Sequence, residues 1–325
     1  MYESKYEQFP DNFSLEKRID NGESLLDIFD DVDYNFKCWG TREAPNRPIT
    51  VRIKDKFNYV VKGALLFENW FASCRDFDDF DDFSYAYRDK KNGYVTRGVF
   101  FNKSGKFIIK EEFNYIRYGN HNGGGKYAIV EQKNGKLNII DLEKGIKSSE
   151  DGLDFDAISV NNVNYDFDIF IVEKGIKNAK DWSPGEVIIS NSRLNEDLKG
   201  IKYNFYKFGV GLLSNEWFDL IHPFEIASKG YDNDYRRWNA FCAVVYKNNK
   251  YNFINQKGEL LSSVWFDIAH VFGIYGGDEY ALGGNLKSQN VSHLSDWLET
   301  DDYFGFNPQK FEIYEVSKNG KITKQ

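Results

Sequence analysis

The sequence has few cysteines, no long apolar run and no excess of positive charge, and each shortage excludes a class of protein. Its three cysteines, Cys38, Cys74 and Cys242, are odd in number and widely spaced, so they predict neither a disulfide framework nor a metal-binding pair. No segment is apolar enough for a signal peptide or a membrane span, and we therefore expect a cytoplasmic protein. The net charge of −8 disfavours nucleic-acid binding, because phosphate recognition needs a concentrated basic face.

Aromatic residues, in contrast, are abundant. They make up 17% of the 325 residues, with 28 Phe and 21 Tyr. Side chains of this kind favour strands and form large buried contacts, so the composition favours a β-rich fold.

The strongest pattern is a phrase that occurs twice without a gap. Residues 203–219 and 251–267 share Tyr, Asn and Phe at the start, Leu-Leu-Ser in the middle and Trp-Phe-Asp at the end. Weaker copies begin near residues 57, 98 and 137, which gives a period of about 40 residues, with extra residues before the fourth copy. A fixed period predicts a repeat architecture and lowers the expectation of an enzyme, because repeats build extended surfaces more readily than one singular site.

Hairpin turns recur between the copies. Lys-Asn-Gly or Lys-Asn-Asn stands at 91–93, 133–135, 247–249 and 318–320. Asn-Gly tolerates the positive φ angles of a type I′ turn and is a strong hairpin signal. Each unit therefore reads as an antiparallel meander of strands. We predict a β-repeat domain over 56–325, with repeat starts near 57, 98, 137, 203 and 251.

Two segments depart from this pattern. Residues 1–55 do not repeat, and we interpret them as a cap over the first hydrophobic face, with a short helix around Leu25 and Ile28. Residues 291–299 predict one inserted helix, N-capped by Ser292. The fold class is thus all-β: tandem antiparallel hairpins in an open solenoid-like array, with propeller-like closure as the alternative.

The repeat phrases resemble those of the WG-repeat proteins of bacteria and their phages. The match is good for 203–219 and 251–267, fair for 57–71 and 98–114, and poor for 137–156; Asn204 and Asn252 stand where that family often has Gly. The resemblance implies an all-β repeat used for interactions, and it transfers no catalytic residue.

Large aromatic residues form two groups with different expected roles. Those that recur with the period are expected to form the repeat core: Trp70, Phe71, Phe113, Trp217, Phe218, Trp265 and Phe266. Aromatics outside the phrase are better candidates for a specific contact, because interface hot spots are rich in Trp, Tyr and Arg. The best local cluster lies in the long connection before the fifth copy: Tyr231, Tyr235, Arg236, Arg237 and Trp238. The alternative is that this cluster only holds the loop in place.

A basic residue recurs three positions after the place of the Trp-Phe-Asp acid, as Arg75, Arg117, His222 and His270. The favoured interpretation is a structural contact, pairing with that acid; the alternative is a row of cations that binds an anionic partner. The acidic run 76–83 lacks the Gly of a calcium loop, and Gly123-Gly124-Gly125 lacks the helix and Lys-Ser or Lys-Thr of a phosphate loop.

We therefore expect no catalytic, cofactor-binding or metal-binding residues. The leading hypothesis is a non-enzymatic interaction or scaffold module with a protein partner, and without nucleic-acid or membrane binding. A structural component of a phage particle is the first alternative, and a carbohydrate-binding module is the second, since exposed aromatics stack on sugars. Self-assembly stays open as well.

Overall fold

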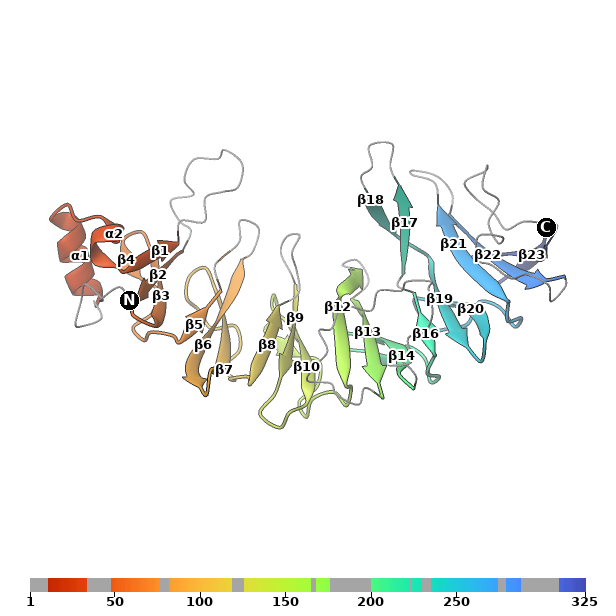
Figure 1. The fold of residues 1–325 in the computed structure, drawn as a ribbon, viewed down its shortest axis with the longest axis horizontal. Coiled ribbons are helices and arrows are strands. Elements are labelled where there is room, and N and C mark those ends of the chain that lie inside the picture. Colours follow the sequence, from red (N-terminus) through yellow and green to blue (C-terminus); the bar gives the residue numbers. More distant parts are fainter. Residues whose placement is uncertain are drawn as a thin grey trace. The chain divides into compact units, whose positions relative to one another are not determined.

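The structure is a computed structural model, and it describes residues 11–33, 48–75, 77, 82–118, 126–164, 168–175, 200–222, 224–229, 235–273, 279–287 and 310–325 (Figure 1). The described chain is all-β apart from two short helices near its start, as the repeat pattern predicts. None of the helices in this part is long and apolar enough to cross a membrane. The chain forms two compact units, Met1–Asp154 and Phe155–Gln325.

The first unit contains both helices and the first eleven strands. They are α1 (Asn12–Asp20), α2 (Leu25–Ile28), β1 (Asp31–Asp33), β2 (Ile49–Ile53), β3 (Lys56–Val61), β4 (Ala64–Leu65), β5 (Ser73–Cys74), β6 (Phe83–Lys91), β7 (Tyr94–Asn102), β8 (Tyr115–Tyr118), β9 (Tyr127–Glu131), β10 (Leu137–Asp141) and β11 (Ile146–Lys147). The strands pair in the orders β1-β2-β3-β4, β5-β6-β7 and β8-β9-β10-β11, all antiparallel.

The second unit contains the remaining strands. They are β12 (Ala157–Asn164), β13 (Ile169–Lys174), β14 (Lys202–Lys207), β15 (Gly211–Leu212), β16 (Leu220–Ile221), β17 (Glu225–Lys229), β18 (Tyr235–Asn239), β19 (Cys242–Lys247), β20 (Lys250–Asn255), β21 (Ile268–Gly273), β22 (Glu279–Leu286), β23 (Phe311–Val316) and β24 (Ile322–Lys324). They pair in the orders β12-β13-β14-β15, β16-β19-β20, β17-β18 and β21-β22-β23-β24.

The repeat phrase forms the third strand of five sheets, β3, β7, β10, β14 and β20 in turn, and its return. The first residue of the phrase forms an antiparallel bridge with a hydrophobic residue near the end of the phrase. The same bridge occurs in five copies: Phe57↔Phe71, Gly98↔Phe113, Leu137↔Leu153, Tyr203↔Phe218 and Tyr251↔Phe266. The five repeat starts predicted from sequence thus occupy one structural position. Gly98 replaces a large residue there because a Cβ at this position would lie 2.5 Å from Cδ1 of Ile116.

Consecutive sheets stack through the third residue of the phrase. Phe205 packs with Ala243, Val245 and Ile254 of the next copy, and Phe253 packs with residues of β21–β23. Tyr59 and Phe100 do the same in the first unit. The hydrophobic core therefore lies between neighbouring sheets as well as along them, which is why a single repeat cannot bury its own apolar face.

Helix α1 covers the first sheet. The Asn12 side chain accepts a hydrogen bond from the Leu65 N–H (2.5 Å) and donates one to the Leu65 carbonyl (3.3 Å). Leu15 is buried with the residues of β2–β4, and Leu65 is only 7% exposed. Helix α2 occurs where a short helix was predicted, whereas α1 was not anticipated. Strands β1 and β2, from the segment interpreted as a cap, complete the sheet of the first repeat.

A sixth, partial copy ends the described chain. The sequence predicted only a last strand over 311–316, but β23 is followed by a turn at Gly320 and the short β24, as β20 is followed by a turn at Gly258. Glu315 stands where Phe253 and its equivalents pack on the next sheet, which explains why the sequence search missed this copy. The predicted helix at 291–299 lies outside the described residues.

Candidate interaction surface

Buried asparagines fix the geometry of four of the five copies, and Val99 stands at this position in the second copy. Asn58, Asn138, Asn204 and Asn252 are all fully buried. Each side-chain oxygen accepts a hydrogen bond from the next backbone N–H, at 2.7–2.9 Å. Each amide donates across the copy to a carbonyl of the return segment, as Asn252 does to Ser262 at 2.9 Å. These two bonds hold the strand that begins each of these copies against its return segment.

The acid of Trp-Phe-Asp links one repeat to the next. Asp219 accepts hydrogen bonds from the Lys202 ammonium and from the Asn248 N–H (3.0 Å). Asp267 binds Lys250 (2.5 Å) and the Leu286 N–H (2.9 Å) in the same way. In both copies a lysine at the start of the same copy binds one carboxylate oxygen, and a backbone amide of the next copy binds the other.

The recurring basic position does not form a row of cations in the second unit. Burial lowers the pKa of His222 to about 4, and the charge of the nearby His270 lowers it as well. His222 is therefore neutral at neutral pH, and its backbone N–H bonds to the Val244 carbonyl at 2.8 Å. In the first unit the Arg75 carbonyl accepts hydrogen bonds from the hydroxyls of Tyr59 and Ser84. The side chain of Arg117 lies outside the described residues.

The second copy replaces the recurring tryptophan with an ion pair. Glu112 occupies the position of Trp70, Trp217 and Trp265, and its carboxylate lies 3.1 Å from Arg88 and 2.9 Å from Arg97. The Arg88 guanidinium lies over the rings of Phe71 and Phe107, at 5.9 and 5.4 Å from their centroids. A cation over an aromatic face thus covers apolar surface of the kind that the Trp rings cover in other copies.

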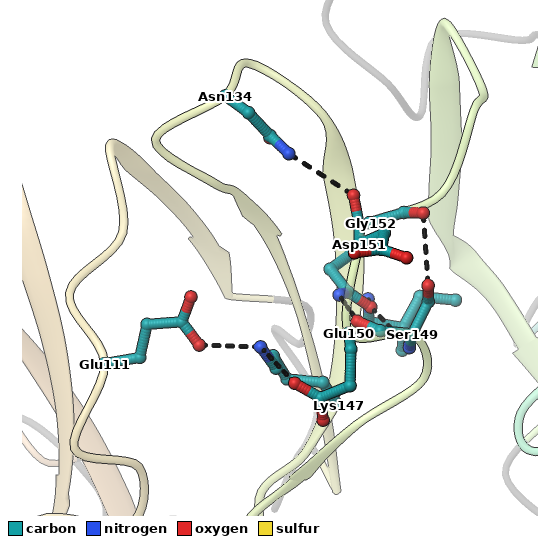
Figure 2. Close-up of polar contacts among 9 residues, drawn as sticks. Glu111, Asn134, Lys147, Ser149, Glu150, Asp151 and Gly152 are labelled. Carbon is teal, nitrogen blue, oxygen red and sulfur yellow. Dashed lines mark hydrogen bonds and ion pairs between the residues drawn. The ribbon is translucent and has the colours of Figure 1, made fainter.

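A second polar cluster links the second and third copies (Figure 2). The Lys147 ammonium lies between the carboxylates of Glu111 (2.8 Å) and Glu150 (3.1 Å), and the hydrogen bond to Glu111 raises the pKa of Lys147. Asn134 donates to the Asp151 carbonyl at 3.3 Å, which ties the β9–β10 turn to the return segment. All these groups have partners, so the cluster is a structural contact between copies.

The recurring aromatic residues divide into a fully buried group and a partly buried group. Phe71, Phe113, Phe218 and Phe266 are at most 1% exposed. The three tryptophans are only partly buried: Trp70 packs beside Phe29, Trp217 beside Phe155 and Lys174, and Trp265 on the core of the fourth and fifth copies. The tryptophans thus pack at the edge of the core, and the adjacent Phe makes the backbone bridge and occupies the interior.

Within the described part of the chain, one buried carboxylate has no partner at either oxygen. Glu173 of β13 is 1% exposed, lies opposite Tyr203 in the sheet, and has no hydrogen bond to a described residue at either side-chain oxygen. Burial, assisted by the negative charge of Asp156, raises the pKa of Glu173 to about 7. Sequence reasoning missed this residue because an acid at the end of a strand has no distinguishing pattern.

The predicted contact cluster lies mainly in the hairpin β17–β18. This hairpin forms its own two-stranded sheet beyond the sheet of β16, β19 and β20 (Figure 1). Its register pairs Tyr235 with Lys229, Arg236 with Ser228, Arg237 with Ala227 and Trp238 with Ile226. The side chains of 225–239 lie outside the described part of the structure, so the backbone pairing of the hairpin is what the structure gives for this cluster. Tyr231 lies outside the described residues, as do Gly123–Gly125.

Within the acidic run 76–83 the structure gives one interior residue. Phe77 is 1% exposed and packs against the rings of Tyr59 and Phe101 at 5.5 and 5.8 Å. This contact anchors the run on the core of the first and second copies. No group of three or more potential metal ligands occurs among the described residues.

Comparisons with known proteins add little. No protein-family model matches the sequence, and no curated protein matches it. Solved structures include the computationally designed Ika8 protein (10% identity, TM-score 0.27, covering 86% of this chain and 80% of that one). Another is Kluyveromyces lactis Hsv2 (12% identity, TM-score 0.25, covering 77% of this chain and 68% of that one). A third is the WD40 beta propeller domain of Doa1 (8% identity, TM-score 0.24, covering 86% of this chain and 89% of that one). TM-scores this low carry no argument, so the fold assignment rests on the strand pairing described above.

Proposed function

We propose that this chain is a non-enzymatic interaction module that binds a protein partner through the hairpin β17–β18. One observation carries the proposal: the hairpin pairs with no other strand among the described residues, although every other strand there belongs to a sheet of three or four. An isolated two-stranded hairpin is only marginally stable in water, and the repeat sheets form their pairs without it. A segment of this kind fits a role in contact better than a role in folding.

The composition of the hairpin supports the same proposal. Four consecutive residues, Tyr235 to Trp238, are of the types that dominate interface hot spots. The resemblance of 203–219 and 251–267 to WG-repeat proteins points in the same direction. The proposal specifies only that the partner is a protein, and the experiment below identifies it.

The hairpin can be removed cleanly. Phe224 and Ala240 flank it, and the Ala240 N–H donates to the Phe224 carbonyl at 2.9 Å. Replacing 225–239 with Asn-Gly would close this pair with a two-residue turn, since Asn-Gly favours the type I′ geometry. We expect the shortened protein to keep its circular dichroism spectrum and melting temperature.

The test is a quantitative pull-down from the source's own lysate or particle, with the full-length chain and the shortened chain as bait. A stoichiometric partner that is retained by the full chain and lost by the shortened one supports the proposal. Single variants then locate the contact within the hairpin: Tyr235→Ala, Arg236→Ala, Arg237→Ala and Trp238→Ala. A partner held equally by the shortened chain overturns the assignment to the hairpin, and quenching of tryptophan fluorescence by sugars would favour the carbohydrate-binding alternative.

A further inference from the structure

The described residues contain four Asn-Gly pairs, and they differ in how tightly the fold holds them. The pairs begin at Asn21, Asn92, Asn134 and Asn319, all of which are exposed. Each following glycine has positive φ, between 78° and 86°. We propose that Asn92 is a site of spontaneous deamidation and that it reacts ahead of the other three.

The reaction needs no partner molecule other than water. The backbone nitrogen of Gly93, after losing its proton, attacks Cγ of Asn92; the new N–Cγ bond forms, the Cγ–Nδ2 bond breaks and ammonia leaves. Water then opens the five-membered succinimide at either carbonyl, which gives aspartate or isoaspartate. Glycine permits the attack because it has no side chain to crowd the ring. No atom changes oxidation state, so no oxidant or reductant is required.

The fold holds two of the competing pairs at both reacting groups. The Asn134 oxygen accepts from the Lys136 N–H (2.9 Å), its amide donates to Asp151 (3.3 Å; Figure 2), and the Gly135 N–H donates to Gln132 (2.9 Å). The Asn319 oxygen accepts from the Lys321 N–H (3.2 Å), and the Gly320 N–H donates to Ser317 (2.9 Å). Each bond must break before the side chain and the nitrogen can meet.

At the first pair only the nucleophile is held. Asn21 follows helix α1, and the Gly22 N–H donates to the Ile19 carbonyl at 2.8 Å. At the Asn92–Gly93 pair, by contrast, neither the Asn92 side chain nor the Gly93 N–H has a hydrogen-bond partner among the described residues. The turn is held only through the neighbouring pair Lys91↔Tyr94, at the end of β6 and β7, where Tyr94 is 78% exposed. Local opening of a hairpin end is the least costly opening in a sheet.

Deamidation would change this hairpin in two ways. Either product places a carboxylate beside Lys90 and Lys91. The isoaspartate product also inserts a methylene into the backbone, which is incompatible with a two-residue type I′ turn. We therefore expect the pairing of Lys91 with Tyr94 to be lost in the isoaspartate form.

The experiment is peptide mapping by mass spectrometry of the folded, full-length protein during incubation in mildly alkaline buffer. A single additional hydrogen bond slows opening about fivefold, so Asn92 should convert at least about fivefold faster than Asn134 or Asn319. The same incubation in denaturant is the control, because Asn92, Asn134 and Asn319 all follow lysine and precede glycine. There the three rates should converge.

Two results would overturn the proposal. One is conversion of Asn21, Asn134 or Asn319 in the folded protein at a rate equal to or above that of Asn92. The other is a lead of Asn92 that persists unchanged in denaturant, because the cause would then be Tyr94 in the local sequence rather than the fold. Asn122–Gly123 lies outside the described residues and does not enter the comparison.

Discussion

At the scale of single residues, the buried asparagines illustrate how polar groups specify this fold. We expect Asn252→Val to destabilise the protein by about 2–3 kcal/mol, because the Phe253 N–H and the Ser262 carbonyl would be left buried without partners. Chemical denaturation with a fluorescence readout measures this loss. A change below about 0.5 kcal/mol would show that water replaces the side chain, contrary to its burial.

Glu173 predicts a second, pH-dependent effect. Its folded-state pKa of about 7 lies above the ordinary 4.5, so its neutral form is the one that the folded state favours. The associated stability is fully present below pH 4.5 and is lost as the pH rises through 7, by about 3 kcal/mol. His222 acts in the opposite sense: its stability is present above pH 6.5 and is lost as the pH falls towards 4.

In the wild type the pH-dependent stability contributions of Glu173 and His222 offset each other. The quantity to measure is therefore the difference in stability between the wild type and a variant of Glu173. We expect Glu173→Gln to gain stability relative to the wild type as the pH rises from about 4.5 to 7, and the difference to be constant above that range. Melting temperatures across the pH series give the comparison. Parallel curves for the two proteins would mean that Glu173 is ionised in the fold at all these pH values.

At the scale of elements, the third strand of each repeat and its return could be predicted from sequence, because Asn, Leu-Leu and Trp-Phe-Asp each serve one fixed contact. The sixth copy could not, since Glu315 replaces the aromatic that identifies the strand. Nor could α1, whose role depends on Asn12 reaching Leu65, 53 residues away. The contact cluster was found as a run of residue types, but its place in a separate two-stranded hairpin required the pairing of β17 with β18.

The turn after β20 allows a sharp test of the contact between repeats. Gly258 has a φ of +83°, and a Cβ there would lie 1.7 Å from the Leu213 carbonyl oxygen of the preceding copy. Gly209 lies in the corresponding turn of the fourth copy, with a φ of +73° and nothing within 4 Å. We expect Gly209→Ala to cost about 1–2 kcal/mol through backbone strain alone.

Gly258→Ala should cost a further 1–3 kcal/mol, approximately, because the turn and the preceding copy must move apart. Equilibrium unfolding of the two variants under the same conditions makes the comparison. If both lose the same amount, the turn does not transmit packing between the copies.

Neighbouring aromatics in the fifth copy should differ in the same assay. Phe266 is fully buried, so Phe266→Ala is expected to cost about 3–5 kcal/mol. Trp265 is only partly buried, and its truncation should cost about 1–2 kcal/mol. The reverse order would place the tryptophan, rather than the phenylalanine, at the centre of the repeat.

At the scale of the whole molecule, the stacking contacts described above join repeats that are neighbours along the chain. Within each unit, a repeat contacts the next through its third-position aromatic (Tyr59, Phe100, Phe205 and Phe253) and, at several copies, through the turn glycine and the acid of Trp-Phe-Asp. In an array of this kind, stability is close to a sum of repeat terms and interface terms. A local defect should therefore be felt most strongly in the repeats beside it.

The division into two compact units gives this argument a measurable boundary. Gly145→Ala places a Cβ 2.7 Å from the Ile108 carbonyl oxygen in the first unit, and Gly258→Ala makes the equivalent clash in the second. We expect hydrogen exchange to accelerate within 11–154 for the first variant and within 155–325 for the second, because each clash lies between repeats of one unit. Equal acceleration across both units in either variant would show that the chain unfolds as a single cooperative array, with the interface terms between all neighbouring repeats strong enough to couple the two ends.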